Sequence, residues 1–71
     1  MKTYCIVDIQ NYDLKGCDFN EEEVIAEARD LCAFLYNETK YAPETFDEAI
    51  RFFEENSIFV FEMNSRIKSG T

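Results

Sequence analysis

The sequence has no histidine, only two glycines and one proline among its 71 residues. Histidine is the commonest general base, it completes the Ser-His and Cys-His pairs of many hydrolases, and it is a frequent zinc ligand. Glycines at positions 16 and 70 alone cannot form a glycine-rich phosphate loop. We therefore expect a protein that is not an enzyme and that holds no cofactor.

The three cysteines are the remaining candidates for metal chemistry. Cys5, Cys17 and Cys32 lack CxxC spacing, so a zinc site would need a carboxylate as its fourth ligand. Residues 13–18 do not match a calcium-binding loop, and we expect no metal site. A secreted scaffold of this size usually carries four or six cysteines, so the odd count predicts free thiols in a reducing cytosol. Cys5 and Cys32 lie in apolar patterns and should be small core residues.

Charge of one sign dominates the chain. Fifteen Asp and Glu residues outnumber seven Lys and Arg, for a formal net charge of −8. Binding to nucleic acid or to an anionic membrane requires clustered basic residues, so we expect neither. Nothing resembles a secretion signal or a membrane span, which predicts a cytoplasmic protein. Two interpretations of the acidity stay open: it keeps the protein soluble, or it favours association with a basic protein surface.

The apolar pattern predicts an α+β fold with the element order β-(β)-α-α-β. Residues 3–9 and 58–63 are rich in β-branched and aromatic side chains, which is typical of buried strands. A polar stretch at 13–19 contains a glycine and predicts a weaker strand at a sheet edge. Two helices at 20–37 and 45–56 should cover one face of this sheet of two or three strands, in which the two apolar strands are neighbours.

The whole chain should form one domain, residues 1–71, with a polar tail at 64–71. Asp8 and Glu62 interrupt the two apolar strands. One interpretation places them on a polar sheet face away from the helices, where they add to the negative surface. The favoured interpretation makes them gatekeepers against edge-to-edge aggregation.

The first helix carries the clearest local signals. Asn20 and Glu23 have the spacing of a capping box, and the helix should extend to about Asn37. Its apolar positions recur with helical spacing and should face the core. They are Val24, Ala28, Leu31, Cys32, Leu35 and Tyr36.

An acidic row occupies another face of this helix. At roughly 100° per residue, Glu23, Glu27, Asp30 and Phe34 fall together within about 60° of arc. No Lys or Arg interleaves the row. We interpret these four residues as a docking strip for a basic partner, in which Phe34 is the desolvated anchor. The alternative is a solvated face with Phe34 packed under the loop at 41–43.

The second helix should begin at a capping box formed by Thr45 and Glu48, and Asn56 should end it as a left-handed cap. Phe52 lies about 110° away from the apolar stripe of this helix. It either covers the sheet edge or forms a second contact point for a partner. Together with Phe34 it would also suit a homodimer interface.

A resemblance to known proteins, in style and layout, spans most of the chain. It lies in the segments MKTYCIVDIQNYDL and YAPETFDEAIRFFEENSIFVFEM. The chain resembles small acidic proteins encoded by phages and prophages of Gram-positive bacteria, which include anti-CRISPR proteins. The resemblance implies a non-enzymatic inhibitor in the bacterial host cytosol that binds a nucleic-acid-binding defence protein. The acidic row would then stand in for phosphates.

Two other hypotheses come from different functional classes. The first is a homodimeric structural or assembly module that buries Phe34 and Phe52. The second is a small protein that captures a nucleotide signal, which would require basic groups beside a pocket, and the few Lys and Arg residues are spread thinly along the chain.

Overall fold

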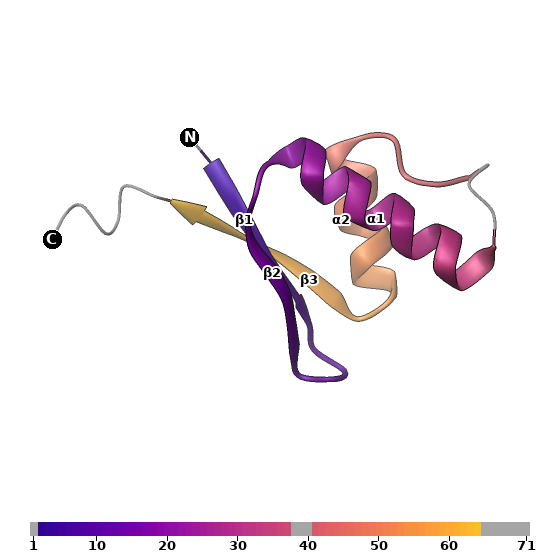
Figure 1. Cartoon of the computed structure of the whole chain (residues 1–71), viewed down its shortest axis with the longest axis horizontal. Coiled ribbons are helices and arrows are strands. Elements are labelled where there is room, and N and C mark those ends of the chain that lie inside the picture. Colours follow the sequence, from indigo (N-terminus) through magenta and orange to yellow (C-terminus); the bar gives the residue numbers. More distant parts are fainter. Residues whose placement is uncertain (1, 38–40, 65–71) are drawn as a thin grey trace, which may run out of the picture.

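The fold is a three-stranded antiparallel sheet with both helices on one side of it (Figure 1). The computed structural model describes residues 2–37 and 41–64. The elements are β1 (Lys2–Asp8), β2 (Asp13–Phe19), α1 (Glu21–Tyr36), α2 (Phe46–Glu55) and β3 (Ile58–Asn64). This arrangement confirms the predicted α+β class and element order. Asn64 of the predicted tail is the last residue of β3, and 65–71 lie outside the described residues.

The sheet has the strand order β2-β1-β3, so the most apolar strands are neighbours and the polar β2 lies at an edge, as predicted. Register determines which side chains share a face. Tyr4 lies opposite Glu62 in β3, while Val7 lies opposite Phe59 in β3 and Leu14 in β2. Because side chains alternate along a strand, Tyr4 and Glu62 lie on the helix side of the sheet. Val7, Phe59 and Leu14 lie on the other side.

The core lies between β1 and the helix pair. Ile6 of β1, Val24 of α1 and Phe53 of α2 are almost completely buried and belong to one cluster. Burying a side chain of this size stabilises the fold by roughly 1.5–3 kcal/mol. The Tyr4 ring packs against that of Phe46 with 4.8 Å between the centroids, which extends the core toward the start of both helices.

Both predicted capping boxes are present and begin their helices at the predicted residues. The Glu23 backbone N–H donates to the Asn20 side chain at 2.8 Å, and the Asn20 N–H donates to the Glu23 carboxylate at 2.9 Å. At α2 the Glu48 N–H donates to the Thr45 hydroxyl at 3.2 Å, and the Glu48 carboxylate accepts from the Thr45 N–H at 3.2 Å. These bonds satisfy N–H groups that a helix start otherwise leaves unpaired. Neither helix in the described ranges is long and apolar enough to cross a membrane.

The end of α2 differs from the prediction. Asn56 has a φ of −109° and is not left-handed, whereas Ser57 has a φ of 62°. The Asn56 side chain donates to the Phe52 carbonyl at 2.9 Å, which keeps Asn56 associated with the last helical turn. The chain reverses one residue later, and the Ser57 N–H then bonds to the Glu54 carbonyl at 3.1 Å. Asn37, in contrast, closes α1 in the left-handed conformation, with a φ of 55°.

Asp8 and Glu62 do not mark a polar face away from the helices. Both lie on the helix side of the sheet, because they share a face with Tyr4 and Ile6. Asp8 is buried and accepts from the Asn11 side chain at 2.9 Å and from its backbone N–H at 3.3 Å. These bonds stabilise the turn between β1 and β2. Asp8 is therefore part of a local turn structure, and the interpretation that it adds to an uncovered negative surface is wrong.

The last turn of α1 extends past the core. Val24, Ala28 and Cys32 are buried as predicted, but Leu35 is 46% exposed and Tyr36 is 57% exposed. With a rise of about 1.5 Å per residue, α1 is roughly 24 Å long and α2 only roughly 15 Å. The shorter helix covers only part of α1, and in the last turn of α1 the Tyr36 ring still contacts the Phe52 ring of α2, with 6.3 Å between the centroids.

Replacing Thr45 with alanine should remove the acceptor for the Glu48 N–H at the start of α2. We expect Thr45→Ala to cost about 1 kcal/mol and to lower Tm by about 4–8 °C, as measured by circular dichroism. Thr45→Ser keeps the hydroxyl and serves as the control, with a Tm close to that of the wild type. Equal losses in both variants would contradict a capping role.

Two carboxylates should make the free energy of unfolding depend on pH. The hydrogen bond from the Asn11 side chain, assisted by backbone N–H groups, holds the pKa of Asp8 below its ordinary value, although burial acts in the opposite direction. The backbone N–H of Glu44 is the largest cause of the lowered pKa of Glu48. Because both pKa values are lower in the folded state, the unfolded state binds more protons in acid. The stabilisation that these two carboxylates give the folded state is complete above their ordinary pKa of about 4. It is lost as the pH falls through the lower pKa values that they have in the folded state.

We expect Asp8→Asn to lower Tm at neutral pH, because asparagine does not supply the charged acceptor that Asn11 requires. The difference in Tm from the wild type should narrow as pH falls from about 5 toward about 2, where the wild-type carboxylate is itself protonated. Glu48→Gln should behave in the same way. Thermal melts across this range measure the effect, and a Tm difference independent of pH would rule out the linkage.

Candidate protein-binding surface

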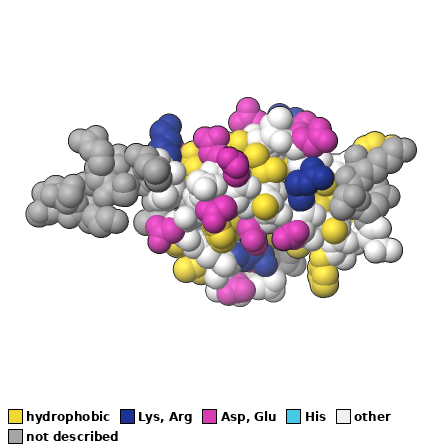
Figure 2. Space-filling model, turned by 45° about the horizontal axis from the view of Figure 1, so that its top comes forward, with side chains coloured by type: hydrophobic (Ala, Val, Ile, Leu, Met, Phe, Trp, Pro, Cys, Tyr) yellow, Lys and Arg dark blue, Asp and Glu magenta, His cyan; other side chains and the backbone are white. Residues whose placement is uncertain are grey.

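The acidic face of α1 comprises Glu23, Glu27, Asp30 and Phe34, and the structure leaves all four side chains exposed. The helix geometry therefore brings together the residues that the sequence singled out. Figure 2 shows acidic side chains spread over the face of the molecule drawn there, with hydrophobic side chains between them and few basic ones. The four side chains differ in the contacts that they make within the chain.

Glu23 has a structural task at the start of α1. Its carboxylate accepts the backbone N–H of Asn20 at 2.9 Å, which holds the side chain against the first turn. The partial positive charge of a helix start offsets part of its negative charge. Glu23 thus contributes to the charge of the acidic face while being oriented by the capping box.

Glu27 and Asp30 are the carboxylates with the most freedom to meet a partner. They border a shallow hollow of about 220 Å³ with Lys15 of β2, and Leu31 and Phe53 complete its lining. Lys15 does not approach either carboxylate within 4.0 Å. Within the described ranges the one ion pair is Lys2–Glu62, at 4.0 Å. The two negative charges are therefore near a cation without being paired to it.

Phe34 is 83% exposed. The alternative in which the loop at 41–43 covers this ring is therefore wrong. Leu35, Tyr36 and Tyr41 are also substantially exposed, so the ring belongs to an apolar end of the helix layer. Exposed aromatic rings near acidic groups are the kind of residue that anchors protein interfaces.

Phe52 does not join the acidic face. Its side chain is half-buried and packs against the core cluster, with its ring 6.3 Å from that of Phe53 and 6.3 Å from that of Tyr36. The ring thus contributes mainly to packing within the chain. A homodimer contact that relies on both Phe34 and Phe52 would find only Phe34 fully accessible.

A second hollow, of about 390 Å³, lies between α2 and the loop that precedes it. Arg51 is the one basic residue in its lining among the described residues, and Glu44, Glu48 and Glu55 line it as well. This charge pattern is unfavourable for a nucleotide phosphate, which needs basic groups or backbone N–H groups around it. In the part of the chain that the structure describes, no three Cys, Asp or Glu side chains lie close enough to hold a metal ion.

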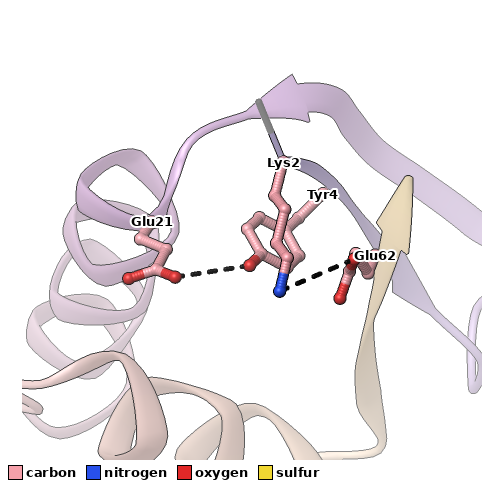
Figure 3. A network of polar contacts seen from close by, with 4 residues as sticks. All are labelled: Lys2, Tyr4, Glu21 and Glu62. Atoms are coloured by element: carbon pink, nitrogen blue, oxygen red, sulfur yellow. Dashed lines mark hydrogen bonds and ion pairs between the residues drawn. The ribbon is translucent and has the colours of Figure 1, made fainter. Parts of the chain in front are cut away.

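A polar network joins β1 to the first turn of α1 (Figure 3). The Tyr4 hydroxyl donates to the Glu21 carboxylate at 3.4 Å, and Lys2 pairs with Glu62 on the adjacent strand. Burial, together with the negative charges of Glu21 and Glu62, raises the pKa of Tyr4. The phenol therefore stays protonated and remains a hydrogen-bond donor, which suits a structural role.

The sheet side away from the helices is a second surface, which the sequence analysis did not assign. We call it the open sheet face. Apart from Thr3 at the start of β1, the side chains that the register places there are apolar or disulfide-bonded: Cys5, Val7, Leu14, Cys17, Phe59 and Phe61. Leu14 is 58% exposed and Phe61 is 53% exposed. The signal for this surface was present in the sequence, because the strand at 58–63 is apolar at positions that point to both faces.

Cys5 and Cys17 form a disulfide between β1 and β2, which contradicts the predicted free thiols. Cys5 is only half-buried, because it points to the open sheet face and not into the core. Cys32 is buried in the helix layer, as predicted, and takes no part in this disulfide. The spacing of the two bonded cysteines gave no sign of their pairing, since it depends on how β2 folds back along β1.

No known protein family matches this sequence, and neither a curated protein nor a solved structure shows significant similarity to it.

Reduction of the disulfide should destabilise the fold without abolishing it. The bond links residues 12 apart in sequence, and closing a loop of this size contributes about 3 kcal/mol. We expect dithiothreitol to lower Tm by about 10–20 °C. The Cys5→Ser/Cys17→Ser double variant should have the same low Tm with and without reductant. A wild-type Tm that does not respond to reductant, together with three titratable thiols in the denatured protein, would contradict the disulfide.

Proposed function

We propose that this chain is a non-enzymatic inhibitor that binds a bacterial defence protein and masks the basic surface with which that protein holds nucleic acid. The acidic face of α1 is the contact surface. The resemblance in style to small acidic phage and prophage proteins supports this class of partner. Such a partner would place the chain in the bacterial cytosol, where reducing conditions would open the Cys5–Cys17 disulfide and the fold would depend on its core alone.

The observation that carries the proposal is the exposure of Phe34 beside carboxylates without ion-pair partners. An exposed phenylalanine on a helix is unfavourable for an isolated soluble chain, and burial against a partner would recover its hydrophobic contribution. Glu27 and Asp30 lie on the same face and have no Lys or Arg within 4.0 Å in the described ranges. A basic partner therefore finds orienting charges and an aromatic anchor together.

Charge density limits how much of the affinity this face can derive from phosphate mimicry. Residues 23, 27 and 30 place one carboxylate about every 5 Å along the helix axis, whereas duplex DNA carries one charge per roughly 1.7 Å. The row replaces only a few phosphates. Affinity must therefore depend strongly on Phe34, and the net charge of −8 serves mainly to speed and orient the encounter.

The proposal can be tested by capture from a Gram-positive bacterial lysate, followed by titration of the purified captured protein. We expect a nucleic-acid-binding protein that loses its nucleic acid when the chain is added. Glu27→Lys/Asp30→Lys should weaken binding and reduce its dependence on salt. Phe34→Ala should cost at least about 2 kcal/mol of binding free energy, as for an interface hot spot.

The matched control is Glu54→Lys/Glu55→Lys, which changes the net charge equally on exposed positions of α2. It should bind nearly as tightly as the wild type. An equal loss of affinity in both double variants would indicate that binding depends on the total charge of the chain and not on the acidic face of α1. Capture of a protein that retains its nucleic acid in the complex would overturn the inhibitor proposal.

A further inference from the structure

We infer that the open sheet face is a self-association surface, on which a second copy of this chain packs sheet against sheet. This inference is independent of the proposed inhibitor function, because it concerns the opposite side of the molecule. It rests on the composition of the face, on where the charges of the chain lie, and on the size of the surface.

The open sheet face is apolar across all three strands. Register places Val7 between Leu14 and Phe59, and Cys5 opposite Phe61. None of these side chains is charged, although the chain carries fifteen acidic residues. A soluble monomer normally keeps such a contiguous apolar surface small or covers it. In a two-fold arrangement the same apolar surface meets itself, so the face is self-complementary.

The distribution of charge favours a second copy over a basic partner at this face. Glu23, Glu27, Asp30, Asp47 and Glu48 all belong to the helix layer, on the other side of the sheet. Two sheets packed face to face lie about 10 Å apart, and each helix layer adds about another 10 Å on the outside. The two helix layers are then separated by about 30 Å, several times the Debye length of about 8 Å at physiological ionic strength. A basic protein, in contrast, would meet Val7, Phe59 and Phe61 on β1 and β3 of this face, none of which can pair with a cation.

The size of the face predicts a weak dimer. Seven-residue strands are about 23 Å long, and three of them span about 14 Å, which is roughly 300 Å² of sheet plane per copy. A standard protein interface buries about 800 Å² per partner. We therefore expect a weak dimer whose population rises with protein concentration. Raising the salt from about 10 mM should strengthen it. At that ionic strength the Debye length is about 30 Å, so two chains of net charge −8 repel each other, whereas physiological salt screens this repulsion.

Sedimentation velocity from about 10 µM to about 1 mM, at low and high sodium chloride, tests the inference. The wild type should shift from monomer to dimer with concentration, and the shift should occur at lower concentration in high salt. Phe61→Glu should weaken the dimer at least tenfold. Leu14→Glu, on the opposite edge strand β2, should weaken the dimer by the same amount. Because it lies on another strand, it shows that the loss in Phe61→Glu does not come from a local distortion of β3. Circular dichroism confirms that each variant is folded.

Phe34→Glu is the matched control, because it makes the same chemical change at an exposed phenylalanine on the helix side. It should dimerise as the wild type does. A wild type that remains monomeric up to about 1 mM at both salt concentrations would overturn the inference. So would a dimer that survives Phe61→Glu and Leu14→Glu but is lost in Phe34→Glu, since the contact would then lie on α1. The salt responses also separate the two proposals: binding of a basic partner weakens with salt, whereas this dimer strengthens.

Discussion

The packing of β1 against two helices is the contact on which the rest of the structure depends. Ile6 lies in one buried cluster with Val24 and Ala28 of α1 and Ala49 and Phe53 of α2, and all five side chains are at most 1% exposed. A chain of 71 residues has material for one such core and no more. One sheet face is therefore covered, and the other remains open.

This one-sided core gives the molecule two surfaces of opposite character. The helix layer presents carboxylates, with Glu27 and Asp30 beside the exposed ring of Phe34. The open sheet face presents apolar side chains such as Leu14 and Phe61. Charged surfaces govern association rates and partner choice, while apolar surfaces contribute affinity without orientation. The two sides thus differ in the kind of contact that each would favour.

The polar edge strand β2 depends on local links more than on burial. Its side chains are mostly exposed, and it is joined to β1 by the Cys5–Cys17 disulfide and by a turn in which Asp8 accepts two hydrogen bonds from Asn11. A strand with little apolar surface gains little from the core, so these links supply much of what holds it. They also keep Leu14 in place on the open sheet face.

The helix starts, which depend on residues close in sequence, were predictable, whereas features governed by strand register were not. Not every local prediction was right, because the left-handed residue after α2 is Ser57 and not Asn56. The capping boxes at Asn20 and Thr45 involve residues three apart, so the amino-acid sequence by itself determined where both helices begin. The exposure of Leu35 and Tyr36, which the helical spacing assigned to the core, became evident only in the folded chain, where α2 covers only part of α1. The pairing of Cys5 with Cys17 and the burial of Asp8 depend on how the strands align, and two irregularities interrupt the β1–β2 register. Only the tertiary structure decided these, because shifting a strand by one residue exchanges its two faces.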